Sequence, residues 1–200
     1  EDVLSREQRS GRICFAGRLD RAKGTAVLRD LVRRYDQWSW TVLGSGPEWL
    51  DWKALQADVG SARLELAGRV SREEVQKQFA TASLVIVPSI VPETFGLVAA
   101  EAMACGTPVV ATHLGGLIEL ISEGQAGLTV PVVEGSDGMA GAIEHLLAAD
   151  GRAWQAASNG GHAFVKRHLV RDVILSELTQ LYHGLLDRRS GAVGSKPTRV

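Results

Sequence analysis

The run Leu84-Val-Ile-Val-Pro88 contains no polar residue. A strand with one face in solvent alternates polar with apolar residues, whereas a parallel strand covered by helices on both faces is apolar throughout. The run therefore predicts a central strand of an open α/β sheet. Such a sheet requires further parallel strands joined by helices, so the rest of the chain must supply alternating strand and helix units.

Short apolar runs that end near glycine or proline alternate with segments of helical spacing along most of the chain. The expected strands are 12–16, 40–43, 63–67, 84–88, 108–111 and 128–130. The expected helices are 25–35, 48–59, 71–82, 95–105, 117–122, 136–149, 152–167 and 169–189, the third opening on the capping box Ser71-Arg-Glu-Glu74. These units predict a single Rossmann-like α/β domain over 12–189, with a doubly wound parallel sheet of about six strands. Residues 1–11 are expected to form a linker and residues 190–200 a disordered tail.

Positive and negative charges nearly cancel, with 22 Lys and Arg against 23 Asp and Glu. A net charge of -1 gives no global basic field, which argues against a nucleic-acid partner or an anionic membrane surface. The chain also lacks the roughly 20 consecutive apolar residues of a membrane span, and it has no signal-peptide core. Cys14 and Cys105 lie in apolar runs without metal-ligand spacing, so we expect buried thiols, no metal site and a cytoplasmic location.

The loop after the first strand combines two glycines with two cations. Open parallel sheets bind ligands beyond the carboxyl ends of their strands, so this loop is placed for binding. Gly17 and Gly24 let the backbone approach a ligand, while Arg18 and Lys23 bring positive charge that suits a phosphate chain. The loop is neither a Walker A motif nor a dinucleotide fingerprint, which disfavours NAD. The alternative is an ordinary surface loop that carries two cations.

The most informative stretch is 92–108, in which Glu101 stands alone among apolar residues. A carboxylate in such surroundings needs a partner, either a buried arginine such as Arg18 or the hydroxyls of a ligand. Glu93 lies in the preceding loop, and Phe95 to Leu97 open the expected helix with free amide groups. Two carboxylates beside an anion-binding helix start match a nucleotide sugar, in which sugar, diphosphate and ribose follow one another.

Five motifs in this order resemble those of the retaining glycosyltransferases of family 4, which have the GT-B fold. They are Gly17-Arg-Leu with Lys23-Gly24, Gly44-Ser-Gly-Pro47, Gly68-Arg-Val70, the pair Glu93 and Glu101, and Gly115-Gly-Leu-Ile-Glu119. The resemblance covers about 13–131 and implies that the chain is the C-terminal, nucleotide-sugar-binding half of a GT-B fold. Ile118 departs from the proline that the family often has at that position.

The resemblance also implies a role for each matching residue. Arg18 and Lys23 would hold the donor diphosphate near Gly17 and act in catalysis, together with Glu93, which would hold the donor sugar beside its anomeric carbon. Glu101 would bind the ribose hydroxyls. The other donor-binding positions would contact sugar, phosphate or base, and they are Arg69, Val70, Thr94, Phe95, Gly96 and Leu97.

By this resemblance the chain is half of a hexosyltransferase that retains the configuration of the sugar and needs neither a metal ion nor a cofactor beyond its donor. Its partners would be a nucleotide sugar and an N-terminal acceptor-binding domain or subunit, and any membrane contact would be made by that missing part. The fragment alone should then be inactive. The alternatives are a stand-alone nucleotide-sugar-binding module, a subunit of a split glycosyltransferase, and a sugar-nucleotide epimerase.

Two further features have both a structural and a functional interpretation. His113 lies in a loop after a strand and could touch the donor. Trp38, Trp40, Trp49 and Trp52 lie close together in sequence and could stack on a sugar or pack in the core. We expect structural roles for the histidine and for the tryptophans.

Overall fold

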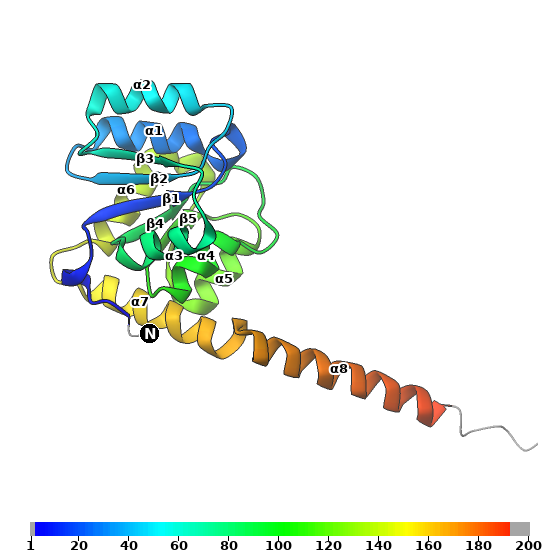
Figure 1. The fold of residues 1–200 in the computed structure, drawn as a ribbon. Helices are drawn as coiled ribbons and strands as arrows, with labels where there is room; N and C mark the ends of the chain where they lie inside the picture. Colours follow the sequence, from blue (N-terminus) through cyan, green and yellow to red (C-terminus); the bar gives the residue numbers. More distant parts are fainter. Residues whose placement is uncertain (1–2, 193–200) are drawn as a thin grey trace, which may run out of the picture.

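The structure of the chain is a computed structural model that describes residues 3–192 (Figure 1). Within these residues, one parallel sheet has the strand order β3-β2-β1-β4-β5-β6. The strands are β1 (Arg12–Ala16), β2 (Ser39–Leu43), β3 (Leu64–Gly68), β4 (Leu84–Val87), β5 (Val109–Thr112) and β6 (Gly127–Val130). This order confirms the doubly wound sheet, and each strand end lies within one residue of its expected position.

The central strands β1 and β4 are apolar because both faces of the sheet are covered there. Ile86 packs into one core together with Ile13 and Phe15. Val85 and Val87 point the other way and belong to a second core on the opposite face. Since neither face of β4 meets water, a polar residue at any of its positions would be buried, which explains its composition.

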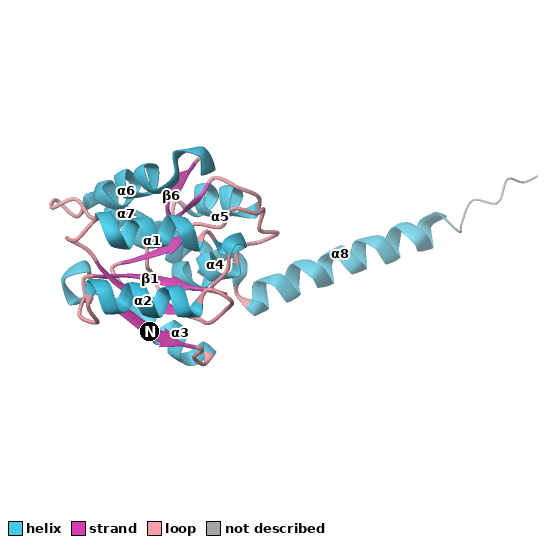
Figure 2. Cartoon of the chain, turned by 90° about the horizontal axis from the view of Figure 1, so that it is seen from above, coloured by secondary structure: helices cyan, strands magenta, loops and turns pink. Residues whose placement is uncertain are grey.

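Helices cover both faces of the sheet (Figures 1 and 2). The helices are α1 (Thr25–Arg34), α2 (Trp49–Val59), α3 (Arg72–Thr81), α4 (Leu97–Ala104), α5 (Gly116–Gly124), α6 (Gly135–Leu146), α7 (Arg152–Phe164) and α8 (Arg171–Ala192). Side chains of α1, α2 and α6 build the first core, and side chains of α3, α4 and α5 build the second. Ser71 caps α3, since its Oγ accepts a hydrogen bond of 3.2 Å from the Glu74 amide. The expected capping box is only half formed, because the Glu74 carboxylate accepts from the Gln78 side chain at 2.9 Å.

The helix α8 projects away from the rest of the domain (Figure 1). A π-helical turn, Val165–Leu169, follows α7, and the extended residue Val170 separates this turn from α8. Ile174 and Leu181, on the expected apolar side of α8, are 40% and 58% exposed. The helix passes the expected end at residue 189, so 190–192 are helical, whereas 193–200 lie outside the described residues. No helix within residues 3–192 is both long and apolar enough to cross a membrane.

The segment before β1, expected to be a linker, is packed against the domain from residue 3 onward. Its Arg9 is buried, and the guanidinium donates to the carbonyl of Ala82 at 2.9 Å and to Thr107 Oγ1 at 2.7 Å. The guanidinium also lies 4.9 Å from the centre of the Trp154 ring. Burial lowers the pKa of Arg9 to about 10. The packing of the domain therefore begins before residue 12.

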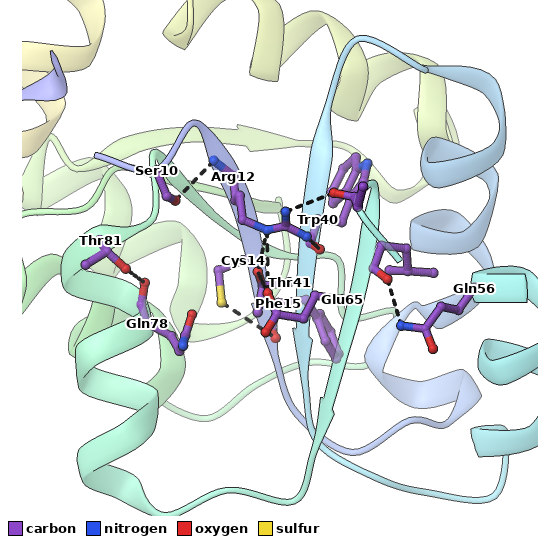
Figure 3. A network of polar contacts seen from close by, with 12 residues as sticks. Ser10, Arg12, Cys14, Phe15, Trp40, Thr41, Gln56, Glu65, Gln78 and Thr81 are labelled. Atoms are coloured by element: carbon purple, nitrogen blue, oxygen red, sulfur yellow. Dashed lines mark hydrogen bonds and ion pairs between the residues drawn. The ribbon is translucent and has the colours of Figure 1, made fainter. Parts of the chain in front are cut away.

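A second arginine fastens the amino-terminal ends of the strands (Figure 3). Arg12, the first residue of β1, donates to Thr41 Oγ1 at 2.9 Å and to the carbonyl of Trp40 at 2.6 Å, both on β2. It also lies 3.8 Å from a carboxylate oxygen of Glu65 on β3. Internal contacts therefore join β1, β2 and β3 near their amino-terminal ends. Open parallel sheets bind ligands at the other side, beyond the carboxyl ends of the strands.

Candidate functional site

The loops that follow β1 and β4 lie side by side at the point where the winding of the sheet reverses. β1 and β4 are hydrogen-bonded neighbours, but the chain runs from β1 toward β2 on one side and from β4 toward β5 on the other. The two crossovers leave a crevice at the carboxyl ends of the strands. The loop after β1 contains a short 3-10 helix, Arg21–Lys23, and the loop after β4 leads into α4.

Two glycines allow the backbones of these loops to touch. Gly24 has φ of +70°, and a Cβ there would lie 1.7 Å from the carbonyl oxygen of Pro88 in the loop after β4. Gly44 after β2 makes the same kind of approach to Gly17, with a virtual Cβ 1.8 Å from its carbonyl oxygen. Side chains are excluded at both positions, so three loops form one continuous wall.

The structure brings Lys23 and Glu93 into direct contact across this wall. Lys23 Nζ lies 2.7 Å from Glu93 Oε1, and the two side chains are 34% and 16% exposed. Burial by itself raises the pKa of Glu93, but hydrogen bonds from Lys23 and Ser89, with the charge of Lys23, hold that pKa below its ordinary value. The site therefore keeps a half-buried, ionised carboxylate beside a cation.

Ser89 and Thr112 complete this cluster, and the sequence had not singled them out. Ser89 Oγ donates to Glu93 Oε1 at 2.6 Å, and Thr112 Oγ1 donates to the carbonyl of Ser89 at 2.6 Å. The main chain of Glu93 is fixed as well, since its carbonyl accepts from the Gly116 amide at 2.7 Å. Both hydroxyl residues lie at the end of an apolar strand, which is the sequence signal that could have identified them.

Glu101 is held differently, by a single exposed arginine on the neighbouring helix α3. Its Oε1 lies 3.0 Å from Arg72, whose side chain is 73% exposed, whereas Glu101 is 24% exposed. The expected alternative partner was wrong, because Arg18 pairs with Asp20 at 3.2 Å. The reason is local: Asp20 lies two residues from Arg18 in the same loop, so the two side chains meet without any ordering by the rest of the fold.

The helix α4 begins two residues later than expected. Gly96 has φ of +85°, in the left-handed region, so the helical conformation starts at Leu97. The first amides of α4 have no partner within the helix and form its positive end. Phe95 and Leu97 are exposed, as is Thr94, whereas Gly96 is buried.

Most of the sequence-predicted residues fall into three groups. A hollow of about 560 Å³ is lined by Gly17, Arg18, Arg69 and Val70. A groove of about 760 Å³ is lined by Phe95, Leu97 and Glu101, with Arg72 beside them. The pair of Lys23 and Glu93 lines neither of these hollows. Arg18 and Glu101 therefore line different hollows, and Lys23 and Glu93 line neither, whereas the sequence had led us to expect one nucleotide sugar in contact with all four side chains.

Most of the tryptophans pack in the core. Trp38, Trp40 and Trp52 are buried, and Trp49 is half-buried with Lys53 Nζ 5.3 Å from the centre of its ring. This confirms the structural interpretation for the three buried rings.

His113 and the two cysteines make local contacts within the domain. His113 Nδ1 lies 2.9 Å from Thr129 Oγ1. Burial raises the pKa of Cys14 to about 12, as expected of a thiol that packs in the core, and Cys105 is half-buried. Within residues 3–192, no three His, Cys, Asp or Glu side chains form a group that could hold a metal ion.

Comparison with known proteins identifies the family. The model of the family "Glycosyl transferases group 1" matches residues 10–149. A D-inositol 3-phosphate glycosyltransferase of Paenarthrobacter aurescens is 41% identical over 143 residues, which are 67% of this chain and 35% of that protein. The chain spans less than half the length of this and three other curated relatives that it matches.

Solved structures show the same fold. Sucrose-phosphate synthase from Thermosynechococcus elongatus superposes with a TM-score of 0.76 at 30% identity, over 92% of this chain and 47% of that one. Anabaena Alr3699/HepE in complex with UDP and glucose gives a TM-score of 0.71 at 25% identity, over 91% of this chain and 49% of that one. These matches confirm the expected half of a GT-B fold, and with the family match over 140 of the 200 residues they show that the chain belongs to the group 1 glycosyl transferases.

Proposed function

We propose that this chain is the donor-binding half of a retaining glycosyltransferase of family 4, and that it binds a nucleoside-diphosphate sugar at the carboxyl edge of its sheet. The observation that carries the proposal is the contact of 2.7 Å between Lys23 and Glu93 at the reversal point of the sheet. A cation and a carboxylate in contact, beside the positive end of α4, offer one group for phosphate and one for sugar hydroxyls.

In this proposal each of the three groups of residues is assigned one part of such a donor. Arg69 and Val70, in the hollow with Gly17, would receive the base. Glu101 would accept hydrogen bonds from the ribose hydroxyls, which a carboxylate with Oε1 on Arg72 can still do through Oε2. The pair of Lys23 and Glu93 would then receive the phosphate and the sugar.

Catalysis is proposed to come from stabilisation of the negative charge that develops on the leaving phosphate. The bond between the anomeric carbon and the phosphate oxygen breaks, a bond from that carbon to the acceptor oxygen forms on the same face, and the acceptor proton passes to the leaving phosphate. Lys23, Arg18 and the first amides of α4, with Thr94, Phe95, Gly96 and Leu97 around them, would stabilise the charge on the leaving group without a metal ion. Removing one such donor should cost about 2.7–4 kcal/mol of barrier in the intact enzyme. Glu93 would orient the sugar.

The acceptor site is assigned to the part of the enzyme that relatives carry beyond the matched region. The first relative is almost three times as long as its match, because the matched residues are 35% of it. The chain alone would therefore bind donor but transfer the sugar poorly. The location that we propose for it is the cytoplasm. The same observation favours a second candidate, a binding module or a subunit of a split enzyme, in which transfer requires a separate chain. Joining the upstream sequence to this chain should create transferase activity, and its failure to do so across many acceptors would favour the binding module.

Donor binding is tested by the thermal unfolding of the 200-residue chain with UDP, GDP and ADP. We expect at least one diphosphate to raise the melting temperature, and Lys23→Ala and Glu101→Ala each to remove most of that rise. Lys166→Ala and Glu144→Ala are matched controls on exposed residues of other elements and should leave the rise intact. Unchanged protection in both site variants would refute the assigned roles, and no protection by any diphosphate would refute the binding function.

A further inference from the structure

The two oxygens of the Glu93 carboxylate have different surroundings. Oε1 accepts from Lys23 Nζ at 2.7 Å and from Ser89 Oγ at 2.6 Å. No group within residues 3–192 forms a hydrogen bond with Oε2. A carboxylate can accept about four hydrogen bonds, so Oε2 retains its capacity for a ligand.

Ser89 is held more firmly than Lys23. It is 1% exposed, it directly follows Pro88 at the end of β4, and its carbonyl is bonded to Thr112 at the end of β5. Lys23 is one-third exposed and carries a long side chain, whose order costs more entropy than that of a serine. The Ser89 hydroxyl is therefore the fixed partner of the carboxylate, and the lysine is the mobile one.

A phosphate group at the site would compete for the lysine. A diphosphate carries more negative charge than a carboxylate, so it competes with Glu93 for the ammonium group of Lys23. If Lys23 alone oriented Glu93, the carboxylate would lose its orienting hydrogen bond when the donor binds. A neutral hydroxyl anchored in the sheet keeps its bond to Oε1, because it carries no charge for the phosphate to attract.

We propose that Ser89 is a positioning residue that holds Glu93 by Oε1 and so presents Oε2 to a hydroxyl of the donor sugar, independently of Lys23. The consequence is selective: loss of the Ser89 hydroxyl should weaken recognition of the sugar and leave recognition of the nucleoside diphosphate intact. This inference rests on the proposed function for its binding readout, but the hydrogen bond itself can be tested without any donor.

The first experiment compares two affinities in each variant by isothermal titration calorimetry. UDP with UDP-glucose and GDP with GDP-mannose are the probe pairs, and the pair for which the wild-type chain prefers the sugar nucleotide is used. Ser89→Ala should lower the affinity for the sugar nucleotide about tenfold and the affinity for the diphosphate less than twofold. Equal losses for both ligands, or no loss, would overturn the proposal.

Ser158→Ala is the matched control. Ser158 is also 1% exposed, and its hydroxyl also donates a hydrogen bond of 2.6 Å, in this case to the carbonyl of Gly106. It lies on α7 and lines neither of the two hollows. The same substitution at the same burial should change neither affinity. If Ser158→Ala lowers the affinity for the sugar nucleotide as much as Ser89→Ala does, the effect reflects general destabilisation and the positioning role is refuted.

The second experiment needs no nucleotide. The side-chain carboxyl carbon of Glu93, labelled with carbon-13, is titrated by NMR in the wild type and in Ser89→Ala. A hydrogen bond to the ionised form lowers a pKa, so its loss should raise the pKa of Glu93. An unchanged pKa overturns the proposal, whereas a raised pKa in a chain that binds no nucleotide would support the hydrogen bond and refute the proposed function.

A conservative variant covers the case in which Ser89→Ala does not fold. Thr112→Val keeps the Ser89 hydroxyl but removes the bond that fixes its carbonyl. We expect the same selective loss for the sugar nucleotide, reduced to about threefold, with the diphosphate unchanged. If Thr112→Val lowers both affinities by the same factor, or lowers neither, then the hydrogen bond from Thr112 on β5 to Ser89 does not help to position Glu93.

Discussion

The two carboxylates of the site are built in different ways. Glu93 is 16% exposed and is held by a lysine from the loop after β1 and a serine from the end of β4. Glu101 is 24% exposed and meets one arginine, itself 73% exposed, on the surface of α3. The first is fixed by loops that are locked together, and the second is held by a side chain that solvent surrounds. In the proposed function, in which Glu93 binds the sugar and Glu101 the ribose, the difference means that the carboxylate for the sugar is the more firmly preorganised of the two.

The largest expected effect comes from forcing apart the loops that fix Glu93. In Gly24→Ala the new Cβ would lie 1.7 Å from the Pro88 carbonyl oxygen, at a φ of +70° that alanine disfavours. We expect a loss of about 3 kcal/mol or more in the free energy of unfolding, measured by urea denaturation.

Gly60→Ala separates the clash from the backbone strain. Gly60 also has a positive φ, +88°, but a Cβ there would meet nothing within 4 Å. Its substitution should cost about 1–2 kcal/mol. Equal losses at the two positions would show that the loops after β1 and β4 are not tightly packed, and the contrast between the carboxylates would lose its basis.

The next effect concerns the Lys23–Glu93 pair. Breaking a fully buried pair costs about 3–5 kcal/mol, but Lys23 is 34% exposed, so we expect about 1–2 kcal/mol for Lys23→Met. A double-mutant cycle with Glu93→Gln should give a coupling free energy near 1 kcal/mol. Lys166→Met is the control for a lysine on an exposed surface. Additive losses in the cycle would mean that the two side chains do not interact in solution.

The pH dependence of stability offers a third measurement on the same carboxylate. The pKa of Glu93 is lowered in the folded chain from its ordinary value of 4.5. Its stabilising contribution is therefore complete above the unfolded-state pKa and is lost as the pH falls through the folded-state pKa. The difference in unfolding free energy between the wild type and Glu93→Gln should stay constant from about pH 7 to about pH 5.5 and shrink below about pH 4.5. A difference that grows on acidification would have the wrong sign for an ionised, hydrogen-bonded carboxylate.

The smallest effect is expected at Glu101. Exposed ion pairs contribute little, so Arg72→Ala should change the free energy of unfolding by less than about 0.5 kcal/mol. The informative outcome is the comparison with Lys23→Met, measured in the same urea series. If Arg72→Ala were the more destabilising of the two, Glu101 and not Glu93 would be the more firmly held carboxylate.

Local sequence was sufficient for the strands and for most helices. An apolar run such as Leu84–Val87, ended by proline, can hardly form anything but a buried strand, and the capping box at Ser71 marks its helix within one turn. The start of α4 was misplaced because a glycine inside a helical pattern does not reveal that its φ is positive. The packing of Arg9 was also missed, since its partners Ala82 and Thr107 are far away in the chain.

The sequence by itself determined the sheet, the edge of the sheet at which a ligand would bind, and the residues that could serve there, because apolar periodicity and strand ends are local properties. Only the tertiary structure decided which charges meet. Lys23 and Glu93 are 70 residues apart, and Glu101 takes Arg72 from a separate helix. A pattern along the chain shows that a buried carboxylate needs a partner, but the identity of that partner depends on the packing of loops and helices in space.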